Sequence, residues 1–319
     1  MKATIKKYYI FNVLKITKDT FMQFIYKIIY NSKINFVLRN TNKLLSPILP
    51  KKIKIPPSGI LTIRNSEKQV LKIKTNQTSY LTYLIFWEGY KNFEYSIIFK
   101  RLIKNINVFF DIGSNIGYYS LLAAWLNDKI KIVAFEPASG PLFYLKENVK
   151  FNNFNNIKVE EIALSEKNGE IVFYEVKNKK YKYLEHNLAG ESNAGSKTTN
   201  RNYVPVFVKS KTLNEYILEN NEEKIDLIKL DTEGTEHLIL KHASIILEKF
   251  KPIVICETLY NTIEPELETI FKKYEYDFYN HTKDGLIKVN SIIRDADNGV
   301  RNCFFVHSSK FYLIKEFVK

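Results

Sequence analysis

The sequence lacks several features that would define other classes of protein. It has only two cysteines in 319 residues, Cys256 and Cys303, and no Cys-x-x-Cys pair, which excludes a disulfide scaffold and a structural zinc site. No uncharged apolar run reaches the length of about 18 residues that a membrane-spanning helix needs. Asn12 and Lys15 interrupt the apolar run near the N-terminus, so no secretory signal is predicted. These absences favour a cytoplasmic protein.

Acidic residues are almost missing from the first 60 residues. This stretch has twelve Lys or Arg and one acid, Asp19, so it carries +11 of the chain's net charge of +14. Phe21, Phe24 and Ile28 fall at helical spacing, which predicts a basic helix with an aromatic face. Such a helix suits an anionic membrane surface, for example the inner face of the cytoplasmic membrane. The plain structural alternative, which the pattern favours, is a helix packed on its own domain or on a partner subunit.

The rest of the chain alternates between strand and helix patterns. We therefore predict a basic N-terminal arm over residues 1–59 and one domain over residues 60–319. Alternating elements with buried apolar strands favour an α/β fold, in which a mostly parallel, doubly wound sheet has helices on both faces. The predicted strands are 61–63, 70–73, 107–110, 130–135, 157–162, 203–208, 225–230, 253–256, 276–279, 286–289 and 303–306, and the main predicted helices are 96–102, 117–126, 142–150, 213–220 and 265–274.

The most specific motif is Phe110-Asp-Ile-Gly-Ser-Asn-Ile-Gly-Tyr118, which joins a predicted strand to a predicted helix. Glycines let the backbone turn sharply and approach a ligand closely, and the helix start offers unpaired N–H groups. The dinucleotide fingerprint Gly-x-Gly-x-x-Gly cradles a pyrophosphate. Here the first position is a carboxylate, Asp111, which would repel a pyrophosphate. A carboxylate suits a ligand with a cationic end and no phosphate, such as S-adenosylmethionine.

Two further acidic motifs follow later predicted strands. Glu136 comes 25 residues after Asp111, and an acid at a second strand end commonly accepts hydrogen bonds from ribose hydroxyls. Asp231 and Glu233 follow the strand 225–230, with His237 just beyond. Because parallel strands end at one edge of a sheet, we expect these acids in one crevice, with Glu233 and His237 as candidate general bases. A strand-end acid, helix-capping acids and a solvated histidine are the plain structural alternatives.

In type and order, these motifs resemble the FkbM-type S-adenosylmethionine-dependent methyltransferases. The resemblance spans about residues 86–257, and one departure is Ser114, where alanine is expected. It implies a Rossmann-like class I methyltransferase fold with an antiparallel C-terminal strand. It also implies O-methylation of a hydroxyl, often on a sugar or polysaccharide and sometimes on a polyketide. The motifs that carry it are Asp111–Ser120, Ala134-Phe-Glu-Pro137, Asn148 and Asn152, Ala163-Leu-Ser-Glu with Gly169, Lys211–Glu215, Ile228–Glu236 and Glu257.

The resemblance also implies roles for single residues. Glu136 would take the ribose, Ala163 would lie by the adenine, and Asp231 would lie near the reactive end of the cofactor. The catalytic candidates are Asp231, Glu233 and His237. A divalent metal on Asp231 and Glu233 would acidify the acceptor hydroxyl directly, and it stays open as an alternative to a base. The cofactor-binding candidates are Asp111, Gly113, Ser114, Asn115, Gly117, Glu136, Pro137, Ala163 and Asp231.

Two other functions compete with this interpretation. An RNA methyltransferase is disfavoured because the place of an Asp/Asn-Pro-Pro-Tyr/Phe motif reads Asp231-Thr-Glu-Gly, and because the domain is nearly neutral, so no nucleic acid is expected as a partner. A non-catalytic, membrane-associated binding protein that keeps the fold is the other alternative. The expected partner is a small-molecule or glycan acceptor, and the oligomeric state stays open. The polar loop 176–202, with Tyr181, Tyr183 and His186, is a candidate lid over this acceptor.

Overall fold

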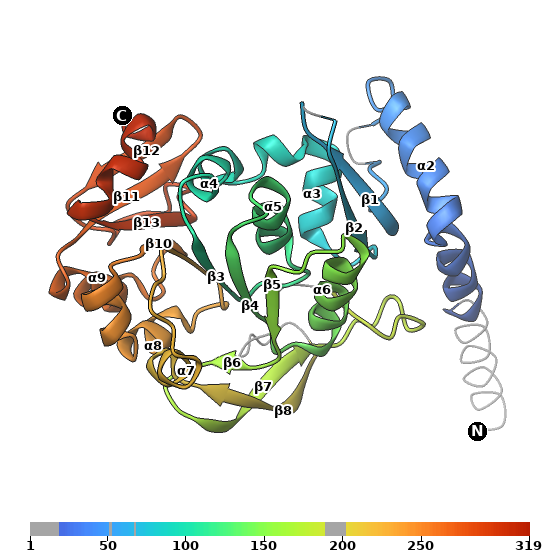
Figure 1. Ribbon diagram of the computed structural model, residues 1–319. Coiled ribbons are helices and arrows are strands. Elements are labelled where there is room, and N and C mark those ends of the chain that lie inside the picture. Colours follow the sequence, from blue (N-terminus) through green and yellow to red (C-terminus); the bar gives the residue numbers. More distant parts are fainter. Residues whose placement is uncertain (1–18, 51–52, 67, 189–201) are drawn as a thin grey trace.

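The computed structural model describes residues 19–50, 53–66, 68–188 and 202–319. Figure 1 shows a central twisted sheet with helices on both sides, and a helical arm that lies along one flank. The start of the predicted arm, residues 1–18, and part of the candidate lid, residues 189–201, lie outside the described residues.

One eight-stranded sheet forms the frame of the domain. The strands β10, β9, β3, β4 and β5 are parallel neighbours, whereas β13 runs antiparallel between β10 and β11. This confirms the predicted sheet, with its antiparallel strand near the C-terminus. In sheet order the strands are β12 (Gly285–Val289), β11 (Tyr276–Thr282), β13 (Asn302–His307), β10 (Ile253–Glu257), β9 (Leu227–Leu230), β3 (Val108–Ile112), β4 (Lys131–Phe135) and β5 (Ile157–Glu160).

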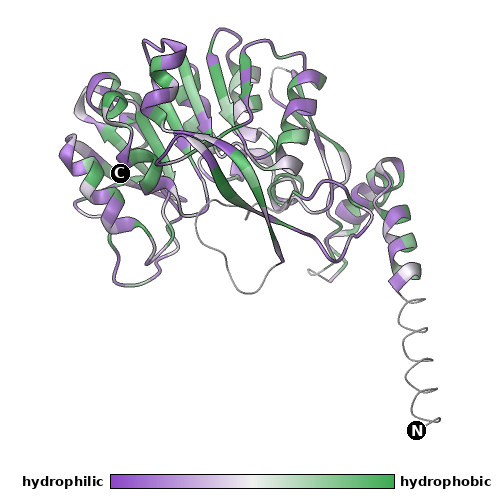
Figure 2. Cartoon of the chain, turned by 90° about the horizontal axis from the view of Figure 1, so that it is seen from below, coloured by the Kyte–Doolittle hydropathy of each residue, from purple (hydrophilic) through white to green (hydrophobic). Residues whose placement is uncertain are grey.

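Helices cover both faces of this sheet because its strands are apolar on both sides. Adjacent residues point to opposite faces of a strand, so Phe109 packs into one hydrophobic core and Phe110 into the other. Figure 2 shows the same pattern as strands coloured hydrophobic between more hydrophilic helix surfaces. The first core holds α3 (Tyr80–Glu88), α4 (Ser96–Ile103), α5 (Tyr118–Leu126) and α6 (Ser139–Phe151), and the second holds α7 (Leu213–Asn220), α8 (Glu236–Lys241) and α9 (Glu264–Lys273).

Two smaller sheets flank the frame. The predicted pair of strands is confirmed as the antiparallel hairpin of β1 (Gly59–Arg64) and β2 (Val70–Thr75). The predicted strand 203–208 exists as part of β8 (Tyr203–Lys211), but it lies outside the large sheet. It pairs instead with β6 (Ala163–Leu164) and β7 (Gly169–Val176). The sequence analysis did not predict α3, since its residues are apolar nearly all round and show no helical period.

The arm consists of a helix over residues 19–29 followed by α2 (Ser32–Leu45). The side chain of Asn31 caps α2 by accepting hydrogen bonds from the backbone N–H groups of Lys33 and Ile34. Among the described residues, no helix combines the length and the apolar character needed to cross a membrane.

Candidate cofactor crevice

The turn between β3 and α5 is held against the ends of two neighbouring strands. The backbone N–H groups of Gly113 and Ser114 both donate to the carbonyl of Phe135, at 3.1 and 3.0 Å. Gly113 has φ +72°, and a Cβ atom there would lie only 1.8 Å from the carbonyl oxygen of Asp231. Glycine is therefore required at this position by the close approach of β9, and the turn lies where the order of the strands reverses.

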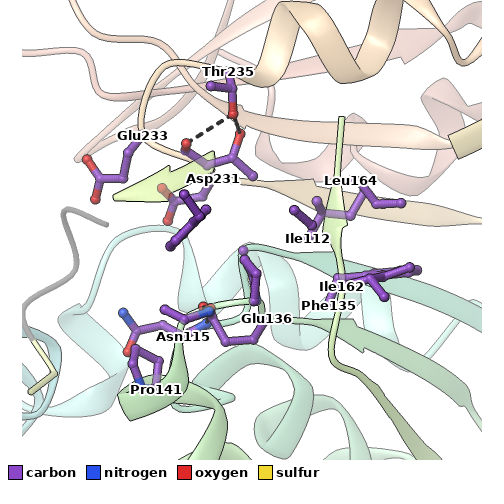
Figure 3. A pocket seen from close by; sticks show the side chains of 16 residues that line it. Ile112, Asn115, Phe135, Glu136, Pro141, Ile162, Leu164, Asp231, Glu233 and Thr235 are labelled. Atoms are coloured by element: carbon purple, nitrogen blue, oxygen red, sulfur yellow. Dashed lines mark hydrogen bonds between the residues drawn. The ribbon is translucent and has the colours of Figure 1, made fainter. Parts of the chain in front are cut away.

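A crevice opens at this switch point, where α/β sheets commonly bind ligands. In Figure 3, Asn115, Glu136 and Pro141 form one side, and Asp231, Glu233 and Thr235 form another. The enclosed volume is about 80 Å³, so a ligand as large as a nucleoside would extend into the open mouth. The lining residues are Ile112, Gly113, Asn115, Phe135, Glu136, Pro137, Ala138, Pro141, Ile162, Ala163, Leu164, Phe173, Asp231, Thr232, Glu233 and Thr235.

Glu136 is the buried acid of the crevice. Its carboxylate accepts hydrogen bonds from the backbone N–H groups of Asn115, at 2.7 Å, and Ala138, at 2.9 Å. Burial raises the pKa of Glu136 to about 7, although both hydrogen bonds favour the charged form. Each carboxylate oxygen has a further lone pair, so Glu136 can also accept a hydroxyl donor from a ligand.

An ion triad, buried at Lys229 and Asp111 and partly exposed at Asp231, supports the floor of the crevice. Lys229, on β9, lies between two acids: its ammonium is 3.7 Å from Asp111 and 3.2 Å from Asp231. It also donates to the carbonyl of Gly113 at 2.8 Å. Burial opposes the charge on Lys229, but Asp231 and Asp111 outweigh burial and raise its pKa. The sequence analysis missed Lys229, although a lysine inside a strand predicted to be buried was itself a signal.

The structure brings most of the predicted site residues together, but not all. Asp111 is only 1% exposed, and its second carboxylate oxygen accepts from the backbone N–H and the hydroxyl of Ser120. It thus lies behind the crevice rather than on its surface. Ser114 is also buried and donates to the carbonyl of Phe135. The predicted residues on the surface are Gly113, Asn115, Glu136, Pro137, Ala163, Asp231 and Glu233, whereas Asp111, Ser114, Gly117 and His237 are not among the lining residues.

Three acids next to the crevice could hold a metal ion. One carboxylate oxygen from each of Asp231, Glu236 and Glu257 lies within 4.8 Å of the others. This group differs from the predicted pair of Asp231 and Glu233. Glu236 accepts from the backbone N–H groups of Thr232 and Gly234, which fixes its orientation. Burial, reinforced by Asp231 and Glu233, raises the pKa of Glu257 to about 9. Oxygen donors of this kind suit Mg²⁺ or Mn²⁺.

The candidate lid has a different role in its described part. Tyr181 is buried against the arm, with its ring 5.1 Å from that of Tyr26 and 5.5 Å from that of Tyr30, so it is not available to an acceptor. His186 stacks on Phe143 at 4.1 Å. Residues 177–185 instead form one wall of a second cavity of about 570 Å³, which shares Ala138 and Pro141 with the crevice.

Together, the order of the strands and the crevice at their switch point define a Rossmann-like α/β protein. The model of the methyltransferase FkbM domain family matches residues 111–278, just over half of the chain. The chain belongs to this methyltransferase family, and the predicted resemblance is confirmed.

Individual relatives agree with this family. The chain is 28% identical to the methyltransferase sdnD of Sordaria araneosa over 196 residues, which cover 52% of this chain and 72% of that protein. An uncharacterized protein of Methanocaldococcus jannaschii, MJ1452, is 34% identical over 74 residues, which are 22% of this chain and 28% of that one.

Solved structures with a similar fold include other methyltransferases. The FkbM methyltransferase of Methylobacillus flagellatus has 14% identity and a TM-score of 0.41, over 62% of this chain and 43% of that chain. The METTL16 methyltransferase domain has 15% identity and the same TM-score, over 77% of this chain and 86% of that chain.

Proposed function

We propose that the protein is an S-adenosylmethionine-dependent O-methyltransferase that acts on a hydroxyl of a sugar, a polysaccharide or a related metabolite. The observation that supports this proposal most strongly is the crevice at the switch point. It combines the buried carboxylate of Glu136 with an apolar wall and with Asp231 and Glu233 on its far side. Glu136 would accept hydrogen bonds from the ribose hydroxyls. The adenine would lie among Ile162, Ala163 and Leu164, which line the crevice as an apolar wall. When bound, S-adenosylmethionine supplies an electrophilic methyl group.

The chain's own residues would prepare the acceptor hydroxyl. Glu233 lines the crevice next to Asp231, so it is our first candidate for the base that takes the hydroxyl proton. Asp111 would act as a positioning residue through Lys229 and Ser120. His237 stays a weaker candidate, because it comes from α8 and is not among the lining residues.

A metal at Asp231, Glu236 and Glu257 is the alternative way to activate the hydroxyl. The two can be separated by measuring turnover of the Glu233→Gln and Glu257→Gln variants, before and after EDTA and after added Mn²⁺. A base mechanism predicts that Glu233→Gln loses about 10²–10⁴-fold and that EDTA changes nothing. Loss of activity with EDTA and recovery with Mn²⁺ in the wild type and in Glu233→Gln, but not in Glu257→Gln, would instead support the metal.

The acceptor class can be tested with a labelled methyl group. S-adenosylmethionine with a labelled methyl is incubated with the protein and with separated glycan, lipid-linked glycan, RNA and protein fractions of a cell extract. We expect label in a glycan fraction, recovered after hydrolysis as an O-methyl sugar. Label in RNA would contradict the proposed acceptor. No transfer to any fraction, with cofactor binding intact, would favour the non-catalytic alternative.

A further inference from the structure

The arm helix α2 has its polar side inward and its apolar side outward. Its buried residues are Asn35, Arg39 and Asn42, which share one helical face because they are four and three residues apart. The opposite side carries exposed apolar residues. A helix at the surface of a globular domain normally has the reverse arrangement, with its apolar stripe toward the core. We define the apolar stripe as Ile34, Val37, Leu44 and Leu45 on α2 together with Ile48 just beyond its end, which are all exposed.

The inner side is polar because it binds backbone. Asn35 accepts from the N–H of Ser58 at 2.7 Å and donates to the carbonyl of Pro56. Arg39 donates to the carbonyls of Ser58 and Ile60, and Asn42 pairs with the N–H of Ile55 and the carbonyl of Ile53. The side chains of α2 therefore satisfy the extended segment that leads into β1. None of these hydrogen bonds uses a side chain from the outer, apolar side of α2.

The exposure of the stripe is large. Val37 is 61% exposed and Leu44 is 79% exposed, and Phe21, Phe24 and Ile28 are also exposed on the preceding helix. Figures 1 and 2 show the arm at the margin of the molecule, outside the layers that form the two cores. Several large apolar side chains exposed together on one arm indicate a contact with a partner or a membrane.

The charge of the arm selects between these partners. Residues 1–60 carry a net +11, and Lys27 and Lys33 are exposed on the two described helices. A second copy docked on the same surface would bring two arms of +11 together, which is unfavourable. A lipid bilayer with anionic headgroups fits both the positive charge and the exposed apolar side chains of the arm, because its apolar acyl chains lie directly below the charged headgroups. We propose that the arm binds an anionic lipid bilayer, with the apolar stripe at the headgroup–acyl boundary and the lysines at the lipid phosphates.

The arm also contacts a wall of the second cavity. Gln23 donates to the carbonyl of Lys180 at 2.8 Å and accepts from the N–H of Lys182 at 3.0 Å. Asp19 forms an ion pair with Lys182, and Tyr26 packs on Tyr181. Since Lys182 also lines the cavity next to the crevice, a lipid-bound arm would hold this cavity near the membrane. The lipid proposal itself does not depend on the proposed methyl acceptor.

Vesicle flotation of the full chain tests the proposal. The vesicles contain phosphatidylcholine alone or with about 30% phosphatidylglycerol, an anionic lipid. The test variant is Val37→Asp with Leu44→Asp, and the matched control is Leu218→Asp, which changes a 60% exposed leucine on the helix α7. Because all three positions are exposed, both variants should fold, which circular dichroism and binding of S-adenosylhomocysteine check.

The proposal predicts that the wild type and Leu218→Asp float with anionic vesicles. The double variant should partition at least tenfold less, and neutral vesicles should bind the wild type at least tenfold less. It is overturned if the wild type does not float with anionic vesicles, or if the double variant floats equally well. It is also overturned if the wild type is a dimer that the double variant converts to a monomer without any vesicle binding.

Discussion

The crevice and the arm both bury polar side chains, but they do so for opposite purposes. In the crevice, buried charges face one another and a ligand site, so Glu136 and Glu257 have raised pKa values. In the arm, buried amides and a guanidinium satisfy the backbone of a neighbouring segment. The buried acids of the first arrangement are suited to bind a ligand or to exchange a proton, but their burial lowers the stability of the fold. The second frees the outer side of a helix for a partner. The position of polar groups therefore indicates function only when their partners are known.

The strongest way to break the crevice is to remove its buried cation. Lys229→Met leaves Asp111 buried beside no cation, and loss of one partner from a buried ion group costs roughly 3–5 kcal/mol. We expect the unfolding temperature to fall by roughly 6 °C or more, because each kcal/mol lost lowers it by about 2 °C in a chain of this size. The control is Lys288→Met, whose ion pair with Asp277 is about half exposed and should hardly matter. Equal unfolding temperatures for the two variants would contradict the triad.

The second change compares two glycines with positive φ. Gly113→Ala places a Cβ 1.8 Å from the backbone of β9, whereas Gly169→Ala meets nothing within 4 Å. We expect Gly113→Ala to shift the turn and weaken binding of S-adenosylhomocysteine by about 100-fold or more, as calorimetry would measure. Gly169→Ala should bind normally and lose about 1 kcal/mol of stability. If both variants bind equally well, the turn does not shape the site.

The pH dependence of binding sharpens the role of Glu136. Ribose hydroxyls donate to the carboxylate, so the ligand favours the charged form, and protonation near pH 7 should weaken binding. We expect the affinity for S-adenosylhomocysteine to be constant above about pH 8 and to fall by up to about tenfold per unit below pH 7. Glu136→Gln should bind more weakly and lack this dependence. If the affinity of the wild type does not change between about pH 5.5 and 8.5, Glu136 does not accept hydrogen bonds from the ribose.

The smallest expected effect is local and lies in the arm. Asn35→Ala leaves the N–H of Ser58 without its acceptor, a loss of about 1–3 kcal/mol. The amide of Ser58 should then exchange hydrogen about tenfold faster or more, while the crevice keeps its affinity for S-adenosylhomocysteine. Asn40→Ala is the control, because Asn40 is exposed and donates only within its own helix, to the carbonyl of Phe36. Unchanged exchange at Ser58 would show that α2 is held by other contacts.

Periodicity and strand-end acids predicted much of the frame and of the crevice. Apolar runs located the central strands, and Glu136, Asp231 and Glu233 follow from their places at strand ends. The depth of Asp111 could not be predicted, because it depends on the pairing of Asp111 with Lys229 across β3 and β9. The partners of Tyr181 could not be predicted either, since they come from the arm, about 150 residues earlier in the chain.

The same limit applies to the arm. The sequence pattern of Phe21, Phe24 and Ile28 indicated an apolar face, but not whether it packs inward. The answer depends on Gln23 and Tyr26, which take the inner side of the same helix because they contact residues 180–182. Which face of an arm helix packs on the domain depends on contacts with residues far away in the chain. The local sequence pattern could therefore not predict it.

The most direct test of the central claim is calorimetric titration of S-adenosylhomocysteine into the wild type and into Glu136→Ala, with unfolding measured in parallel. We expect one binding site per chain in the wild type. In Glu136→Ala we expect an affinity at least tenfold weaker, with an unchanged unfolding temperature. A folded wild type that binds no S-adenosylhomocysteine, or a variant that binds equally tightly, would contradict the assignment of the crevice as the cofactor site.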